Sequence, residues 1–203
     1  MYFGKVTTRT LAYTLAGAAL GVMSLAGSVA QASGWTLDKA QSTLSTHITD
    51  HRSAGDKTST LRATSIQGSI NAQGDIQLPL SLDQLDVIAQ LPPMLTHKAM
   101  KQSSILLKGH IDPQLLQNLN MGQAQTTLVS FWSDQQPERH VTYPLRLTLL
   151  QDQRIQVDTP APIILDATPL LQKDNASVIL SLLGYERVDS KVKAEFYGIL
   201  VAQ

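Results

Sequence analysis

The stretch Asp75-Ile76-Gln77-Leu78-Pro79-Leu80-Ser81-Leu82-Asp83 alternates aliphatic residues with polar residues or proline along its whole length. Successive side chains of a β-strand point to opposite faces of the sheet, so this spacing predicts a strand with one apolar face. Pro79 lacks the N–H group that a central strand donates, which favours a sheet edge or a bulge. The preceding Asn71-Ala72-Gln73-Gly74 has the composition of a hairpin turn. The stretch therefore predicts an antiparallel sheet.

The same period of two recurs along the rest of the chain. The segment 191–201 alternates strictly, with apolar residues on one face and Lys or Glu on the other over its first half. The other predicted strands cover residues 35–48, 61–70, 103–111, 124–133, 141–149 and 155–165, the last interrupted by Pro160 and Pro162. About eight strands with hairpin links predict an all-β fold, either a sandwich or a closed antiparallel barrel.

A few short helices are predicted between the strands. One lies within residues 87–102. The second runs from Asp112 to Leu119, with Asp112 as the N-cap and Pro113 at the first helical position. The third covers 175–183, where Asn175 caps the start and Gly184 ends the helix. No repeat or linker is visible, so residues 33–203 are expected to form one domain.

The first 32 residues have the pattern of a cleavable export signal. Lys5 and Arg9 provide a positive start, residues 11–26 are apolar and small, and Ala30-Gln31-Ala32 matches the A-x-A cleavage pattern. Cleavage would leave 171 of the 203 residues, Ser33 to Gln203, in the periplasm. The alternative is a retained membrane anchor, since residues 11–32 are almost long enough to span a bilayer.

Composition argues against several classes of partner. The chain has 16 basic and 16 acidic residues, and loss of Lys5 and Arg9 would change this balance to 14 against 16. A chain so close to neutral lacks the basic surface typical of nucleic-acid or anionic-lipid binding. No later apolar run approaches membrane-spanning length, so the mature chain is not expected to be an integral membrane protein. Absence of Cys excludes disulfides.

No catalytic residue, metal ligand or cofactor is predicted. The pattern G-x-S-x-G of a nucleophile elbow is absent, as are HExxH and glycine-rich phosphate loops. Five histidines are present, namely His47, His51, His97, His110 and His140. A metal-dependent enzyme would require His47, His51 and a further ligand to converge in the fold. Surface roles are the expectation for these side chains.

The order of segments resembles the YceI-like family of exported, lipocalin-like antiparallel β-barrels, some of which bind a polyisoprenoid lipid. The matching segments are Trp35-Thr36-Leu37-Asp38, Ser42-Thr43-Leu44-Ser45, Ile66-Gln67-Gly68-Ser69-Ile70, Leu80-Ser81-Leu82-Asp83-Gln84-Leu85-Asp86, Gly109-His110-Ile111-Asp112, 176–183 and 192–200. Two departures are visible: residues 87–95 lack the charged Arg/Asp/His segment common in the family, and residues 133–139 replace its short glycine hairpin. The resemblance implies a lipocalin-like barrel of about eight strands.

The resulting hypothesis is an exported protein without catalysis that holds an apolar small molecule or lipid, such as a polyisoprenoid or a quinone, inside the barrel. The predicted ligand-contacting wall residues are Leu78, Leu80, Leu147, Leu149, Val192, Ala194 and Phe196. The alternative is that these side chains fill the barrel and the domain serves as a periplasmic interaction or stress-response module. The sequence leaves the oligomeric state open.

Overall fold

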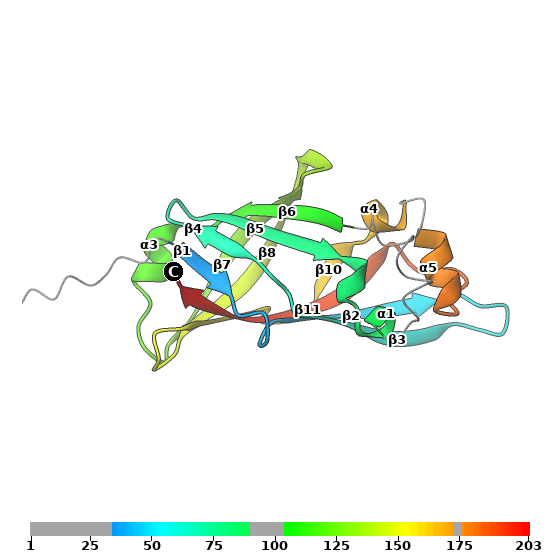
Figure 1. Ribbon diagram of the computed structural model, residues 1–203, viewed down its shortest axis with the longest axis horizontal. Coiled ribbons are helices and arrows are strands. Elements are labelled where there is room, and N and C mark those ends of the chain that lie inside the picture. Colours follow the sequence, from blue (N-terminus) through cyan, green and yellow to red (C-terminus); the bar gives the residue numbers. More distant parts are fainter. Residues whose placement is uncertain (1–33, 90–103, 173–175) are drawn as a thin grey trace, which may run out of the picture. The chain divides into compact units, whose positions relative to one another are not determined.

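The computed structural model describes residues 34–89, 104–172 and 176–203 (Figure 1). The expected signal segment, His97 and Asn175 lie outside these ranges. The strands are β1 Gly34–Leu37, β2 Thr43–Asp50, β3 Lys57–Thr64, β4 Ser69–Asn71, β5 Asp75–Ser81, β6 Ser104–His110, β7 Ala124–Ser133, β8 Gln136–Leu149, β9 Ile155–Asp158, β10 Ile163–Asp166 and β11 Lys191–Ala202. The short helices are η1 Leu82–Gln84, α1 Asp86–Ala89, α3 Pro113–Gln117, α4 Thr168–Leu171 and α5 Ala176–Leu182.

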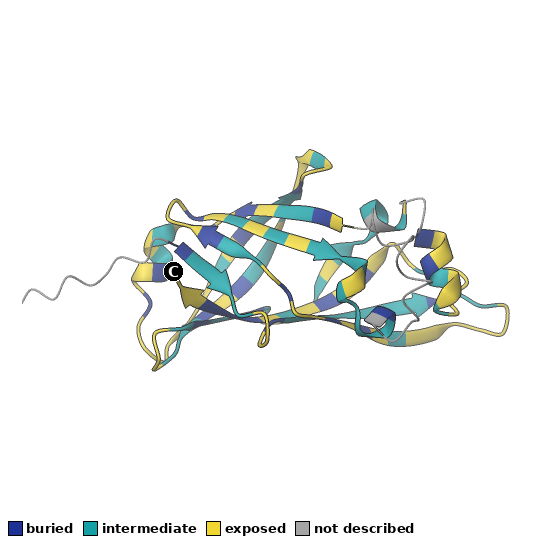
Figure 2. Ribbon diagram, viewed as in Figure 1, coloured by how far each residue is buried: buried dark blue, intermediate teal, exposed yellow. Residues whose placement is uncertain are grey.

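The 11 strands form one antiparallel sheet, and eight of them close into a ring. The ring runs β1-β4-β5-β6-β7-β8-β9-β11 and closes where β11 pairs with β1, with Leu37 opposite Leu200. Exposed and partly buried residues alternate along β5, as the period of two predicts (Figure 2). The prediction of an all-β fold with a few short helices is therefore confirmed, and so is the antiparallel lipocalin-like barrel of about eight strands.

Strand β11 holds the ring together and extends beyond it. Its C-terminal part pairs with β1 on one edge and β9 on the other, whereas its N-terminal part pairs with β2 and β10. Beside the N-terminal part of β11, side chains link β8 to β10. Tyr143 Oη on β8 donates to the Ile164 carbonyl on β10 at 3.0 Å, and Arg139 pairs with Asp166.

Three predicted strands are each divided into two, and the break in residues 155–165, between β9 and β10, falls at Pro160 and Pro162, where an interruption was expected. Residues 35–48 are split into β1 and β2 by a turn in which Asp38 Oδ1 accepts from Ala40 N and Ser42 Oγ donates to the Asp38 carbonyl. Such short side-chain bonds to the backbone compete with a sheet ladder. Residues 61–70 are split into β3 and β4, and Ser65 between them has a φ of 60°. Pro79 lies beyond the last residue of β5 that pairs with β4, consistent with its missing N–H.

The predicted helix signals hold where the structure describes them. Asp112 caps α3 by accepting from Gln114 N at 2.9 Å, with Pro113 at the start. Gly184, with a φ of 75°, follows the end of α5 in the left-handed conformation that favours glycine. Of the segment 87–102, only the part within α1 is described.

Residues 133–139 form a tight β7–β8 hairpin in which Gln136 N donates to Ser133 Oγ.

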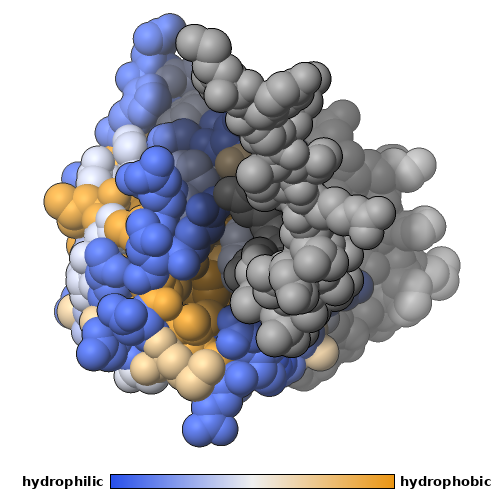
Figure 3. All heavy atoms as spheres, turned by 90° about the vertical axis from the view of Figure 1, so that its left-hand side faces the viewer, coloured by the Kyte–Doolittle hydropathy of each residue, from blue (hydrophilic) through white to orange (hydrophobic). Residues whose placement is uncertain are grey.

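The end of the barrel beneath α3 is tightly packed. Its cluster of buried aliphatic side chains comprises Ile70, Ile111, Leu116, Leu119, Val129, Leu145, Leu147, Ile155, Val157 and Leu200. Full burial of one such side chain contributes about 1.5–3 kcal/mol. Seen from this end, hydrophilic side chains surround a smaller hydrophobic area on the described surface (Figure 3). Among the described helices, none has the length and apolar character needed to cross a membrane.

Candidate ligand cavity

Two cavities lie inside the sheet, with volumes of about 230 and 110 Å³. For comparison, an apolar cavity of about 150 Å³ stays dry and accommodates benzene. The larger cavity extends from β2, β3 and β5 to α4 and α5, at the end away from α3 (Figure 1). The smaller one lies between it and the packed cluster, because Ile70, Leu145, Val157 and Leu200 belong to both the cluster and the cavity wall.

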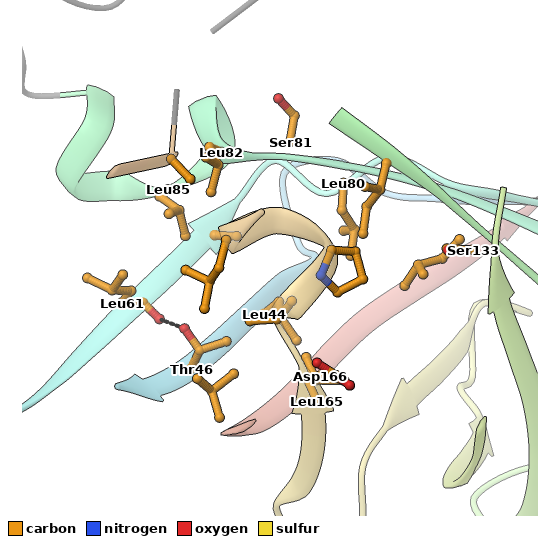
Figure 4. A pocket seen from close by; sticks show the side chains of 18 of the residues that line it. Leu44, Thr46, Leu61, Leu80, Ser81, Leu82, Leu85, Ser133, Leu165 and Asp166 are labelled. Carbon is orange, nitrogen blue, oxygen red and sulfur yellow. Dashed lines mark hydrogen bonds between the residues drawn. The ribbon is translucent and has the colours of Figure 1, made fainter. Parts of the chain in front are cut away.

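The wall of the larger cavity is mainly aliphatic. Leu44 on β2, Leu61 on β3 and Leu165 on β10 surround the space shown in Figure 4, together with Leu82 and Leu85 beside η1. Thr46 also lines it, but its hydroxyl donates to the Leu61 carbonyl at 3.3 Å and is thereby satisfied. The α5 end is covered by Ala176, Ile179, Leu180 and Leu183. An apolar guest would therefore meet few polar groups that need water.

The smaller cavity is almost entirely apolar. Its wall includes Leu37, Ile66, Ile76 and Leu78 from one side of the ring and Phe196 from β11. Thr159 is a polar member of this wall, and its hydroxyl accepts a hydrogen bond from Phe196 N at 3.1 Å. A polar group that is already bonded does not require a ligand or water. This end of the interior suits a hydrocarbon.

The two cavities share part of their wall, which we call the waist. It consists of the side chains that line both cavities: Leu44, Leu80, Leu107, Phe131, Tyr143 and Leu165. The rings of Phe131 and Tyr143 pack against each other with centroids 6.2 Å apart and planes tilted by 40°. The hydrogen bond from Tyr143 to the Ile164 carbonyl fixes the second ring to β10.

Charged side chains lie at one part of the larger cavity, and each has an ionic partner. Arg139 Nη2 lies 2.7 Å from Asp166 Oδ2. The pKa of Asp166 is lowered by its hydrogen bonds to Thr168 and by the Arg139 charge, which together outweigh burial. Burial, and secondly the charge of Asp166, raises the pKa of Tyr143, so its phenol stays neutral. Asp189 also lines the cavity, and its Oδ1 lies 2.9 Å from His51 Nε2.

Four of the seven predicted wall residues line the cavities. Leu78 and Phe196 line the smaller cavity, Val192 lines the larger one, and Leu80 belongs to the waist. Leu147, Leu149 and Ala194 line neither. Leu147 is 1 % exposed within the packed cluster, Leu149 packs against that cluster, and Ala194 is completely buried with a side chain too short to reach far inward.

The sequence did not identify β2 and β3 as part of the wall. Leu44, Thr46 and Ile48 stand at alternate positions of β2, which is a weak signal that polar neighbours obscure. Phe131 lines both cavities and so belongs to the waist, a position that strand alternation alone does not reveal. The apolar helix α5 was predicted, but nothing in its sequence showed that it would cover a cavity.

The histidines that the structure describes are dispersed. His47 contacts Thr60, and His110 contacts Asp75. His51 lies between Asp56 and Asp189, and His140 packs against Trp132 with ring centroids 4.8 Å apart. Within residues 34–89, 104–172 and 176–203, no three His, Cys, Asp or Glu side chains are grouped so as to hold a metal ion.

No protein-family model and no curated protein matches the chain. A solved structure does: a polyisoprenoid binding domain from Saccharophagus degradans implicated in plant cell wall breakdown. The alignment has a TM-score of 0.63 and 18% sequence identity, and it covers 83% of this chain and 98% of that domain. The resemblance inferred from the order of sequence segments is confirmed at the level of the fold. This chain shares the lipocalin-like fold of a polyisoprenoid binding domain.

Proposed function

We propose that this protein is an exported binding protein that holds an apolar ligand, a polyisoprenoid lipid or an isoprenoid quinone, inside its barrel. The observation that carries the proposal is the pair of adjoining cavities with aliphatic walls. The fold shared with a polyisoprenoid binding domain supports it. A domain serving only as an interaction or stress-response module on this scaffold was expected to have a filled interior, so the cavities favour ligand binding.

Burial of hydrocarbon is the expected source of affinity. Each buried CH₂ group contributes about 0.8 kcal/mol, so a prenyl unit of five carbons contributes up to about 4 kcal/mol. Association costs about 4–15 kcal/mol in lost freedom of motion. One prenyl unit is therefore insufficient, and several must be buried together. The two adjoining walls, from Leu180 in the larger cavity to Leu78 in the smaller one, can together bury several units.

The polar groups of the larger cavity support a ligand whose head carries no net charge. Among the described wall residues, Arg139 is paired with Asp166, and Asp189 lies 2.9 Å from His51. A phosphate head would have to compete with Asp166 for the guanidinium. A prenol or a quinone needs only hydrogen bonds, which Ser133 or Gln136 at the same cavity can offer.

Export is the second part of the proposal, and it is supported by the sequence of residues 1–32. We expect the protein in the periplasm after cleavage between Ala32 and Ser33. Expression of the full chain in a Gram-negative host, followed by fractionation and intact-mass measurement, tests this. A periplasmic product beginning at Ser33 supports export. An uncut chain in the membrane fraction contradicts it.

The ligand is tested by solvent extraction of the protein purified from such a host, followed by mass spectrometry of the extract. We expect a stoichiometric isoprenoid lipid or quinone in the extract. An equal amount of a β-rich periplasmic protein without a cavity provides the background level. Extracts that repeatedly match this background, together with no uptake of added prenol or quinone, would contradict the proposal.

A further inference from the structure

We infer that the waist divides the interior into two compartments and that Phe131 thereby sets the length of isoprenoid tail that the protein accepts. The inference rests on the proposed function and specifies its ligand. The smaller cavity ends at the packed cluster, which contributes Ile70, Leu145, Val157 and Leu200 to its wall. A tail that extends from the larger cavity into the smaller one passes Phe131, which lines both.

The volumes give each compartment a capacity. If about 150 Å³ holds the six carbons of benzene, then about 230 Å³ holds roughly nine carbons and about 110 Å³ roughly four. These numbers correspond to about two prenyl units in the larger cavity and one in the smaller. The interior therefore accommodates about three units, the third beyond the waist. Further units would remain outside the cavities.

Gly109 determines where the Phe131 ring lies. The two residues are direct partners in the β6–β7 ladder. A Cβ atom placed on Gly109 would lie 2.9 Å from Phe131 Cδ1, 3.1 Å from Phe131 Cε1 and 3.0 Å from the backbone oxygen of Ser130, so the ring and the neighbouring strand together occupy the space of a side chain at this position. The ring is thus seated against the sheet at Gly109. A methyl group at Gly109 would push the ring towards the interior.

Two substitutions are expected to change the space at the waist in opposite directions. Gly109→Ala moves the ring inward and narrows the waist, whereas Phe131→Ala removes the ring and joins the compartments. Leu147→Ala is the control for loss of an apolar side chain inside the barrel, because Leu147 is buried in the packed cluster and lines neither cavity. If Phe131→Ala does not fold, Phe131→Leu retains apolar contact while removing the ring.

The experiment measures the affinity of geraniol, farnesol and geranylgeraniol, which contain two, three and four prenyl units, for the purified protein by calorimetry. For the wild type we expect farnesol to bind at least about tenfold more tightly than geraniol, and geranylgeraniol no more than about threefold more tightly than farnesol. In Gly109→Ala, farnesol should bind no more tightly than geraniol, and the affinity of geraniol should be unchanged. In Phe131→Ala, the affinity should rise again from farnesol to geranylgeraniol. Leu147→Ala should retain the wild-type order.

The outcomes separate this inference from the proposed function. If the wild type binds none of the three prenols or their quinone counterparts, the proposed function fails and the inference fails with it. If the prenols bind but affinity rises evenly through four units, the waist does not limit tail length. An equal change in all three affinities in both waist variants would also overturn the inference while leaving the proposed function intact.

Discussion

His51 is held between two carboxylates, with Nδ1 2.8 Å from Asp56 Oδ1 and Nε2 2.9 Å from Asp189 Oδ1. Only the imidazolium form donates from both nitrogens. The hydrogen bond to Asp189, followed by that to Asp56, raises the pKa of His51 above its ordinary 6.5 despite burial. A pKa raised by folding stabilises the native state fully below the unfolded pKa, and this contribution is lost as pH rises through the folded pKa.

The prediction is that the wild type loses stability from about pH 6.5 upward, through the raised pKa of His51. His51→Asn, which cannot titrate, should be less stable than the wild type at pH 5.5 and should show less of this decline. Urea unfolding at intervals from pH 5.5 to 8.5 measures both curves. Parallel curves for the two proteins would show that His51 does not carry the effect.

Asp50 connects β2 to the segment between α5 and β11. It is fully buried and accepts hydrogen bonds from Arg52 Nε, Glu186 N and Arg187 N. Burial acts to raise the pKa of Asp50, but these three hydrogen bonds outweigh it and hold the pKa below its ordinary value. The carboxylate therefore fixes the chain that follows α5, close to the larger cavity.

We predict that Asp50→Ala lowers the urea midpoint clearly, because two backbone N–H groups and the Arg52 guanidinium lose their acceptor. Asp83→Asn is the control, since it also alters an aspartate carboxylate but at an exposed position. Chemical denaturation followed by circular dichroism compares the two. Equal midpoints for the variants would mean that the Asp50 cluster contributes little to the fold.

At the level of strands, β8 and β5 differ in what their inward side chains meet. Leu147 on β8 is packed on all sides in the cluster beneath α3, whereas Leu78 on β5 borders the smaller cavity. Removal of a closely packed leucine costs both its transfer free energy and the cavity left behind. Where a cavity already exists, fewer contacts are lost.

Leu147→Ala is therefore expected to lower the free energy of unfolding by about 2–5 kcal/mol without changing prenol affinity. Leu78→Ala should lower the free energy of unfolding by less and should alter farnesol affinity instead. Unfolding curves and calorimetric titration of both variants separate the two effects. The reverse pattern would place the ligand at the packed end.

The sequence predicts strands better than it predicts the wall of the cavity. Period two is a local property, so β5 and β11 were predicted close to their observed bounds. The strand breaks near Asp38 and Ser65 depend on local turns and on the choice of neighbouring strand. The alternation of apolar and polar residues carries no information on either. Alternation shows which side chains point inward but not how far along the barrel axis they lie. Leu147 and Leu78 were therefore both predicted to contact the ligand.

At the level of the whole molecule, the barrel is packed at one end and open inside at the other. α3 and ten clustered side chains fill the first end. Phe131 and Phe196 pack against this cluster and line the cavities, and their rings lie over glycines, Phe131 at Gly109 and Phe196 at Gly198. Four predicted wall residues fall in the open part. The fold thus combines a core that supplies stability with a space that can receive an apolar guest.

An apolar chain in this space would give intermolecular nuclear Overhauser effects between bound farnesol and methyl groups of the labelled protein. We predict contacts from farnesol to the methyl groups of Leu78, Leu80 and Val192, and none to Leu147. Contacts confined to exposed side chains such as Leu128 or Val178, with none at Leu78 or Val192, would contradict the account.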